Sequence, residues 1–309
     1  MIEMTDVTKR FKGVEAVKGM NFYLEKGEAV GLLGPNGAGK STAISMLSSL
    51  VKPTTGEVRF KGEPINKQMQ TFRRSIGVVP QEIALLPQLT AEENLLFFGQ
   101  IYKLSGRALK KKAERLLALV GLTERRKDKV KTFSGGMKRR LNTAAALMHD
   151  PEFLLMDEPT VGVDPQSRRH LLDTVKDLQK SQGVTVLYTS HYMEEVEYLC
   201  DRLYVMDRGD VIASGSKGEI KGVLSQARTY ELRLSEKREE IEQALQEDGR
   251  VEAVAEIDNG YRVTSTEPDF FMALLEIVTA AGADVRGIEA NSPTLEDVFL
   301  HLTGRTLRD

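Results

Sequence analysis

The sequence of 309 residues has one cysteine, no tryptophan and no long apolar run. The single cysteine, Cys200, cannot form an intramolecular disulfide, and without others nearby it cannot build a cysteine-based metal site, as fits a reducing cytosol. The N-terminus lacks the apolar core of a signal peptide, and no stretch of 18 uncharged apolar residues is present. If the function involves a membrane, we expect another chain to cross it.

Net charge is also nearly absent, with 43 lysines and arginines against 45 acidic residues, which excludes a bulk polyelectrolyte binder. Locally the balance differs. Tyr102–Arg140 holds 14 basic and three acidic residues, whereas Gln226–Asp309 holds nine basic and 18 acidic ones. The shift predicts a domain boundary near residue 225, hence domains 1–224 and 225–309. The basic stretch indicates either solvated helix faces or a surface for anionic lipid or a partner loop.

The first part alternates short apolar runs with helical patterns. Such alternation predicts an α/β domain with a mostly parallel sheet and a helical subdomain at about 91–150. The expected strands are Glu28–Leu33, Phe153–Met156 and Val184–Thr189, and the expected helices are Thr42–Leu50, Ala91–Leu104 and Arg107–Val120.

The tail has a different pattern, with the order βαββαβα typical of a small ferredoxin-like α+β domain. The expected strands are Tyr230–Leu234, Val251–Ile257, Tyr261–Ser265 and Val285–Glu289, and the expected helices are Lys237–Glu247, Pro268–Ala281 and Thr294–Leu302.

Gly34–Ser41 reads GPNGAGKS, a full match to the phosphate-binding loop pattern, and it lies between an apolar run and a helix. Its glycines allow the backbone to curl so that N–H groups face phosphate oxygens. Lys40 supplies positive charge near the β- and γ-phosphates, and Ser41 offers a hydroxyl to Mg²⁺. The motif predicts a nucleotide site at the start of the helix.

Leu154–Glu158 reads LLMDE, an apolar strand that ends in two carboxylates. Alone this pattern is often structural, but beside a phosphate-binding loop it indicates the acidic half of a nucleotide site. Asp157 is expected to reach Mg²⁺ through water, and Glu158 to polarise the attacking water as general base.

Thr132–Met137 reads TFSGGM and directly precedes a helical segment, so it forms a second candidate anion site. Two phosphate cradles in one subunit make sense when two nucleotides are sandwiched between two subunits. At this point the sequence resembles the ATP-binding subunits of ABC transporters, whose signature motif usually reads LSGGQ.

The remaining motifs of that family follow in order. Gln81 lies 41 residues after the loop lysine and matches the Q-loop. Val161–Asp164 matches the D-loop, His191 lies 33 residues after the catalytic glutamate and matches the switch histidine, and Phe11 matches the adenine-stacking aromatic. The resemblance covers about residues 2–222.

The resemblance implies a role for each matched residue. Gln81 would sense the γ-phosphate and the metal, His191 would hold the transition state, and Ser134 and Gly136 would clamp the γ-phosphate of the other protomer, with Asp164 orienting elements across the interface. The implied catalytic residues are Glu158, His191, Gln81 and Lys40. The implied ATP-binding residues are Phe11, Gly34, Pro35, Asn36, Gly37, Ala38, Gly39, Lys40, Ser41, Thr42, Ser134, Gly135, Gly136 and Asp164. The implied Mg²⁺ ligands are Ser41, Gln81 and Asp157.

Three positions differ from the usual motif sequences of the family: Phe133 and Met137 in the signature, and Val163 in the D-loop. The Ser-Gly-Gly core is intact, so ATP binding is still expected, whereas Met137 removes a side-chain amide that could support the interface.

A cluster of apolar residues follows Gln81 and is expected to be core, or in part a groove for a short helix of a transmembrane partner. Its members are Leu85, Leu86, Leu89, Leu95, Leu96, Phe97 and Phe98.

The end of the tail, Ser292–Arg305, is similar to the C-terminal extension of ABC-2 exporter ATPases of the daunorubicin-resistance type, expected here to stabilise or to contact a dimer. The resemblance implies an ATP- and Mg²⁺-dependent ATPase that forms a head-to-tail homodimer. It also implies a separate transmembrane permease, a location on the cytoplasmic face of the membrane, and no nucleic-acid partner. The alternatives are an importer ATPase, a soluble ABC-type ATPase acting on ribosomes or DNA, and a non-catalytic ATP-gated regulator.

Overall fold

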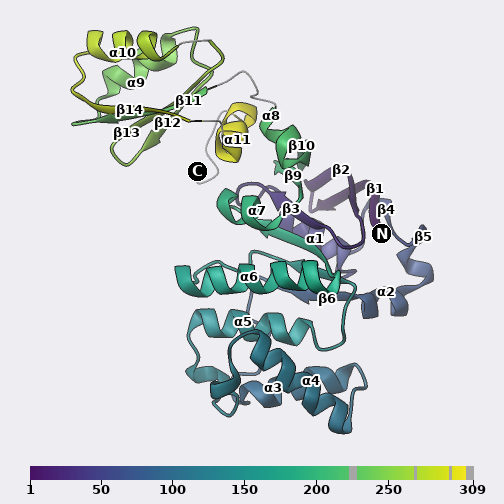
Figure 1. The fold of residues 1–309 in the computed structure, drawn as a ribbon. Helices are drawn as coiled ribbons and strands as arrows, with labels where there is room; N and C mark the ends of the chain where they lie inside the picture. The colour runs from purple at the N-terminus through teal and green to yellow at the C-terminus, as the bar shows by residue number, and fades with distance from the viewer. Residues whose placement is uncertain (223–227, 268–269, 292–293, 304–309) are drawn as a thin grey trace. The chain divides into compact units, whose positions relative to one another are not determined.

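The computed structural model describes residues 1–222, 228–267, 270–291 and 294–303 (Figure 1). The chain divides into two compact units, Met1–Val211 and Ile212–Asp309. The boundary expected near residue 225 lies outside the described residues, so the division into 1–224 and 225–309 stays a prediction. Within the described ranges, no helix has the length and apolar character needed to cross a membrane.

The central sheet has six strands in the order β10-β9-β3-β8-β7-β6. The pairings that join β9, β3, β8, β7 and β6 are all parallel. Every residue of β3, β7 and β8 is buried, which explains the continuous apolar sequences of β3 and β7. Because parallel strands end at one edge of a sheet, the residues after them meet there. The strands are β3 (Ala29–Leu33), β6 (Ile76–Val79), β7 (Phe153–Met156), β8 (Thr185–Ser190), β9 (Arg202–Asp207) and β10 (Asp210–Ser216).

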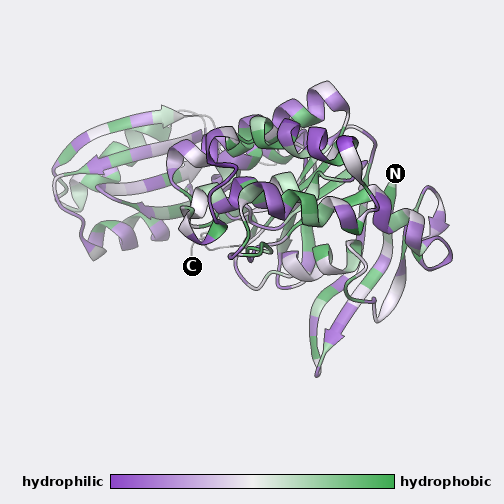
Figure 2. Cartoon of the chain, turned by 90° about the horizontal axis from the view of Figure 1, so that it is seen from below, coloured by the Kyte–Doolittle hydropathy of each residue, from purple (hydrophilic) through white to green (hydrophobic). Residues whose placement is uncertain are grey.

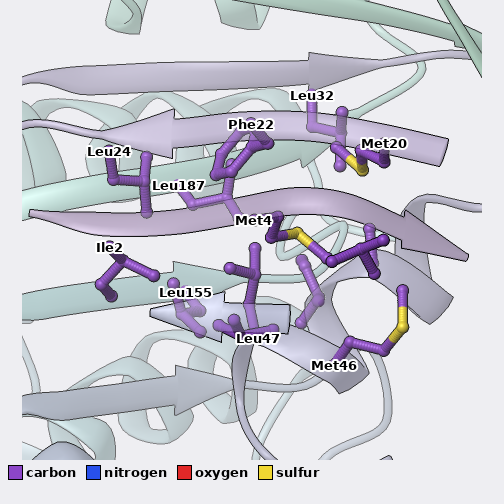
Figure 3. Packing of buried hydrophobic residues seen from close by; sticks show 14 of the residues in the cluster. Ile2, Met4, Met20, Phe22, Leu24, Leu32, Met46, Leu47, Leu155 and Leu187 are labelled. Atoms are coloured by element: carbon purple, nitrogen blue, oxygen red, sulfur yellow. The ribbon is translucent and has the colours of Figure 1, made fainter. Parts of the chain in front are cut away.

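A second sheet, which the sequence patterns did not predict, has the order β2-β1-β4-β5 and antiparallel pairings. Apolar residues of this sheet, including Ile2, Met4 and Phe22, share one buried cluster with Leu155 and Leu187 of the central sheet (Figure 3). Each such fully buried side chain stabilises the fold by about 1.5–3 kcal/mol. The strands are β1 (Ile2–Phe11), β2 (Val14–Leu24), β4 (Thr55–Phe60) and β5 (Glu63–Pro64).

Three helices form the helical part of the first unit: α3 (Ala91–Ile101), α4 (Gly106–Leu119) and α5 (Gly135–Ala146). Helix α3 begins with a capping box, in which Thr90 Oγ1 accepts from the Glu93 N–H and Glu93 Oε2 accepts from the Thr90 N–H. Helix α4 buries residues spaced at helical intervals, whereas Lys110 and Lys111 on its other side are exposed. Its buried residues are Leu109, Ala113, Leu116 and Leu117.

The expected helix Thr42–Leu50 is instead α1, Lys40–Leu47. It starts directly after the glycine loop, and it ends because Ser49 takes a left-handed φ of 60°.

Cys200, which directly follows α7, is buried. The other helices of this unit are α2 (Met69–Ser75), α6 (Pro165–Gln182) and α7 (Met193–Leu199), with the 3-10 turns Ile65–Lys67, Thr123–Arg125 and Val130–Thr132. Hydrophobic residues concentrate along the central strands (Figure 2).

The second unit holds an antiparallel sheet in the order β12-β13-β11-β14, which confirms the ferredoxin-like prediction. Its core includes Tyr230, Leu232, Ile241, Phe270 and Leu274. Position 268 of the predicted helix Pro268–Ala281 lies outside the described residues, and so do positions 292–293 and 304–305 of the segment Ser292–Arg305. The elements are β11 (Arg228–Leu234), β12 (Ala253–Ile257), β13 (Gly260–Ser265), β14 (Val285–Asn291), α8 (Lys217–Gly222), α9 (Glu239–Glu247), α10 (Phe270–Ala280) and α11 (Leu295–Thr303).

Candidate functional site

The loop between β3 and α1 carries the predicted phosphate-binding residues. Its backbone has positive φ angles of 154° at Gly34 and 108° at Gly39, a region that disfavours side chains. A Cβ at Gly39 would clash with the carbonyl oxygen of Ala16, and a Cβ at Gly34 with that of Met206. Glycine is therefore required at both positions for the loop to pack closely against its neighbours.

The start of α1 leaves backbone donors open to an anion. The N-cap residue Gly39 offers no side-chain hydrogen bond to the first turn, so the amides there are not capped from within the chain. The loop is braced from outside by the Gly209 N–H, which donates to the carbonyl of Ala38 over 3.0 Å. Asn36 and Gly37 are exposed at the tip. Pro35, Ser41 and Thr42 complete the segment.

Lys40 is 4% exposed, and its ammonium is fully engaged. Nζ donates to the carbonyls of Gly34 at 2.7 Å and Pro35 at 3.1 Å, and it lies 3.1 Å from Glu158 Oε1. A buried charge is tolerated only with such partners. Lys40 and Glu158 thus form a buried ion pair in the site.

Glu158, directly after Asp157 at the end of β7, has a left-handed backbone with φ of 44°. This conformation costs a non-glycine residue about 1–2 kcal/mol. The Glu158 N–H donates to Thr189 Oγ1 over 2.9 Å, which holds the turn in place. Strain of this kind persists where the surroundings fix it, and here it directs a carboxylate that is almost fully buried.

Gln81 and His191 meet at the other oxygen of Glu158. Gln81 Nε2 donates to Glu158 Oε2 over 3.4 Å, and His191 Nδ1 lies 3.5 Å from the same atom. His191 Nδ1 is buried beside the Glu158 carboxylate and makes no hydrogen bond in the described structure. The structure therefore brings together the four residues predicted to be catalytic, including Lys40.

The side chains expected to hold Mg²⁺ supply oxygen donors. Ser41 Oγ lies 3.2 Å from Asp157 Oδ1, which also accepts from Thr189 Oγ1 over 2.9 Å. Hydroxyl and carboxylate oxygens suit Mg²⁺. The described residues contain no group of three or more His, Cys, Asp or Glu side chains placed to hold a metal. Phosphate and water oxygens would therefore have to complete the coordination shell.

The signature and D-loop residues form a second group at the starts of α5 and α6. Ser134 caps α5, accepting from the Met137 N–H over 3.2 Å, and Asp164 caps α6, accepting from the Ser167 N–H over 2.9 Å. The hydrogen bonds from Ser167 lower the pKa of Asp164. Gly136 is packed so closely that a Cβ there would lie 2.5 Å from Ser167 Oγ and 3.2 Å from Asp164 Oδ2. The described contacts of Ser134 do not reach the cluster around Glu158.

The expected adenine-stacking residue, Phe11, lies at the end of β1 with 46% of its surface exposed. The Lys9 ammonium is 4.9 Å from the centre of its ring. An exposed aromatic ring at a strand end offers a face to a planar base. This placement is compatible with stacking on adenine.

The apolar cluster after Gln81 is split between core and surface. Leu85 and Leu95 are buried, Leu89, Leu96 and Phe98 are half-buried, and Leu86 and Phe97 are exposed. Ile101 and Tyr102, at the end of α3, are also exposed. The core interpretation therefore applies to Leu85 and Leu95, whereas a groove for a transmembrane partner stays a prediction.

Sequence reasoning missed several polar residues at the end of β8. Thr189 binds both Asp157 and the Glu158 backbone, and its neighbours Tyr188 and Ser190 hydrogen-bond to buried Glu195. The available signal was the hydroxyl residues that end the apolar run 184–189. Residues at the carboxyl end of a parallel strand lie at the edge where the site forms.

Two family descriptions match the sequence. That of "ABC transporter" matches residues 17–161, and that of "ATP-binding protein DrrA1-3-like, C-terminal domain" matches residues 215–303. The linearmycin resistance ATP-binding protein LnrL of Bacillus subtilis is 48% identical over all of both chains. The daunorubicin/doxorubicin resistance ATP-binding protein DrrA of Streptomyces peucetius is 36% identical over 100% of this chain and 94% of its own.

A third relative, the Nod factor export ATP-binding protein I of Rhizobium sp. (strain N33), is 38% identical over 99% of this chain and 98% of its own. Among solved structures, the fold is similar to a dimeric post-hydrolysis state of the ATP-binding cassette MJ0796 bound to ADP and phosphate. The TM-score is 0.65 at 30% identity, over 70% of this chain and 98% of that one. The cassette cbiO1 from Clostridium perfringens gives a TM-score of 0.66 at 29% identity, over 73% of this chain and 93% of that one.

Proposed function

The chain belongs to the family of ABC transporter ATP-binding subunits, and from this premise we propose how its site hydrolyses ATP. It is an ATPase of the exporter type, as the DrrA-like tail and the drug-resistance and Nod factor export relatives support. The tail match favours export over the alternative of an importer. ATP hydrolysis by this subunit powers transport through another component.

The proposal for the catalytic residues is carried by one observation, the convergence of Lys40, Gln81 and His191 on the Glu158 carboxylate. Glu158 would act as general base toward the attacking water. Lys40 would exchange its contact with Glu158 for phosphate oxygens. His191, whose partly exposed ring lies beside Glu158, would hold a γ-phosphate oxygen as charge develops. Exchange of partners by Lys40 releases the base when a phosphate is present.

Mg²⁺ would supply charge neutralisation on the β- and γ-phosphate oxygens. Ser41 would bind it through its hydroxyl, Asp157 through water, and Gln81 through its amide oxygen. Gln81 donates through Nε2 to Glu158, which leaves its amide oxygen as an acceptor. The three residues thus carry hard oxygen donors around the Glu158 cluster.

We propose that two copies close head-to-tail, with Ser134, Gly135 and Gly136 of one protomer facing the phosphate loop of the other. The dimeric relative supports this arrangement. We also propose a separate transmembrane permease that holds the chain at the cytoplasmic face of the membrane, with exposed Leu86 and Phe97 among its contacts. ATP would favour the closed dimer, and hydrolysis would remove that preference.

Phosphate release from purified protein in Mg-ATP tests the catalytic part. Wild type should turn over ATP, and Lys40→Ala should lower turnover at least about 100-fold because the phosphate charge loses its partner. Arg169→Ala, an exposed change on α6 outside the site, is the matched control and should retain activity. Equal turnover in Lys40→Ala and wild type would remove the phosphate loop from the mechanism.

A pull-down from detergent-solubilised membranes tests the transport part. A polytopic membrane protein in near-equal amount would support the permease. Recovery of only ribosomal or DNA-repair proteins would contradict it while leaving the ATPase intact.

A further inference from the structure

A buried carboxylate that the proposed mechanism does not use lies behind the catalytic cluster. Glu195, on α7, is 3% exposed. Its Oε2 accepts three hydrogen bonds, from Thr160 Oγ1 at 2.9 Å and from the Tyr188 and Ser190 hydroxyls at 2.8 Å each. Its Oε1 lies 3.3 Å from Arg168 Nε in an ion pair. One side chain therefore joins three separate segments of the chain.

Two of these contacts reach the segment that leads from the general base to the D-loop. Thr160 stands two residues after Glu158, and Arg168 stands in the first turns of α6, four residues after its cap Asp164. Glu195 thus contacts both ends of residues 160–168. A shift of its carboxylate would therefore change the backbone position near both Glu158 and Asp164.

Another contact, the hydrogen bond from Ser190, leads to the switch histidine. Ser190 directly precedes His191, and its Oγ also accepts from the Tyr192 N–H over 2.9 Å. The Tyr192 ring lies 4.1 Å from that of His191, and the Arg168 guanidinium lies 4.6 Å from the Tyr192 ring. The loop that carries His191 is therefore fixed from its backbone and from one face of its ring.

A carboxylate has a specific advantage at this position, because it accepts hydrogen bonds and never donates when ionised. It takes the single proton of Ser190, which leaves the Ser190 oxygen free to accept from Tyr192. Burial, with the nearby Glu195 carboxylate, raises the pKa of Tyr188 well above its usual value, so its hydroxyl stays a donor. The three hydroxyl protons of Thr160, Tyr188 and Ser190 therefore all point toward Glu195 Oε2.

Stability alone does not explain this choice. Burying an ionised carboxylate is costly, and apolar side chains of similar volume often stabilise a core equally well or better. A carboxylate kept at 3% exposure, with three hydroxyl donors aimed at it, instead defines one geometry.

We propose that Glu195 is a positioning residue that fixes the His191 loop and the segment 160–164 relative to each other. In this inference, which rests on the proposed function, His191 and Glu158 reach the γ-phosphate together because both of their backbone segments are tied to one carboxylate.

The test compares Glu195→Gln with Glu194→Gln, an exposed neighbour on the same helix that the mechanism does not use. In Glu195→Gln, the introduced amide keeps the volume of the side chain but loses the charge and turns a donor toward either the hydroxyls or Arg168. We expect kcat to fall about tenfold, with KM for Mg-ATP within about twofold because the phosphate loop is untouched. Glu194→Gln should match wild type in both.

A second pair of variants separates positioning from folding. Thr160→Val removes the hydroxyl and Thr160→Ser retains it, so kcat should fall in the first and be largely restored in the second. Below the unfolding temperature, a purely structural role would leave kcat unchanged in all four variants. That result would overturn the proposal.

Hydrogen exchange gives a readout that does not depend on activity. The Tyr192 amide should exchange faster, by about tenfold, in Glu195→Gln than in Glu194→Gln, because its acceptor Ser190 is no longer oriented. Unchanged local exchange would reject the positioning role even if wild type shows no turnover. Absent wild-type turnover with the expected exchange difference would count against the proposed ATPase and not against the network.

Discussion

The Glu158 carboxylate lies 3.1 Å from the Lys40 ammonium, and both side chains are almost fully buried. The same Lys40 also binds two carbonyls of the phosphate loop. The proposed general base is thus paired with the group that is proposed to bind phosphate. In the proposed mechanism, Lys40 would exchange this contact for phosphate oxygens, and Glu158 would then be free to polarise water.

Glu158→Gln should trap the closed state. Glutamine keeps the size and the contact with Gln81 but cannot take a proton, so turnover should fall at least about 100-fold while Mg-ATP still binds. Size-exclusion chromatography in saturating Mg-ATP should show a stable dimer, and the same variant without nucleotide should stay monomeric. A variant that remains monomeric with Mg-ATP contradicts the head-to-tail arrangement.

Gly136→Ala and Gly135→Ala form a matched pair. A Cβ at 136 would lie 2.6 Å from Ser167 Cβ, whereas a Cβ at 135 would meet only the Gly162 carbonyl, at 3.5 Å. We expect Gly136→Ala to destabilise the fold by about 1–3 kcal/mol, as overpacking does. Gly135→Ala should be neutral or slightly stabilising because alanine favours helix. Urea unfolding measures both, and equal stabilities would contradict the close packing.

Thr189→Val tests the hydroxyl that supports the strained Glu158 backbone. The change is nearly isosteric but removes the acceptor of the Glu158 N–H and a donor to Asp157. Leaving a buried donor unpaired should cost about 1–3 kcal/mol and also lower turnover. Thr189→Ser keeps the hydroxyl and is the control. If valine and serine behave alike in unfolding and in phosphate release, the hydroxyl does not support the turn.

His149 should make stability depend on pH. Its ring stacks on Tyr102 at 3.8 Å, Nε2 contacts the Ile76 carbonyl at 2.9 Å, and burial lowers its pKa. A histidine with a lowered folded-state pKa binds protons more readily when unfolded, so wild type should lose stability as pH falls below about 6.5.

The His149→Gln variant keeps a donor for Ile76 but does not titrate. Its free energy of unfolding, from urea melts at pH 7.5 and 5.5, should therefore fall less than that of wild type over this interval. An equal fall in both proteins would show that other groups determine the acid sensitivity.

Much of the site was predictable because phosphate chemistry demands particular residue types in a fixed order. The spacing of Lys40, Gln81, Glu158 and His191 identified side chains that the structure brings together around one carboxylate. The fully buried strands were equally readable, since continuous apolar runs such as Phe153–Met156 mark them. In the tail, the order of strands and helices along the chain was predictable from the alternation of short elements.

The antiparallel sheet of the first unit was not predicted, because β1 and β2 have mixed burial and several register shifts that obscure the alternation of apolar residues. Support of the site by Thr189 and Glu195 was missed for a different reason. Hydroxyls and carboxylates at such positions are common on surfaces, and only the packing of α7 against β8 reveals that these are buried. Local pattern carries no information about that contact.

The burial of Cys200 makes the chain well suited to thiol-based reporters. With its only native thiol 1% exposed, a cysteine placed on the surface would be the sole site that a maleimide probe reaches under native conditions. Surface cysteines on either side of the expected protomer contact, placed outside the proposed ATP-binding residues, could then be cross-linked without first removing a background cysteine. Opening and closing of the dimer could thus be followed in an otherwise unaltered protein.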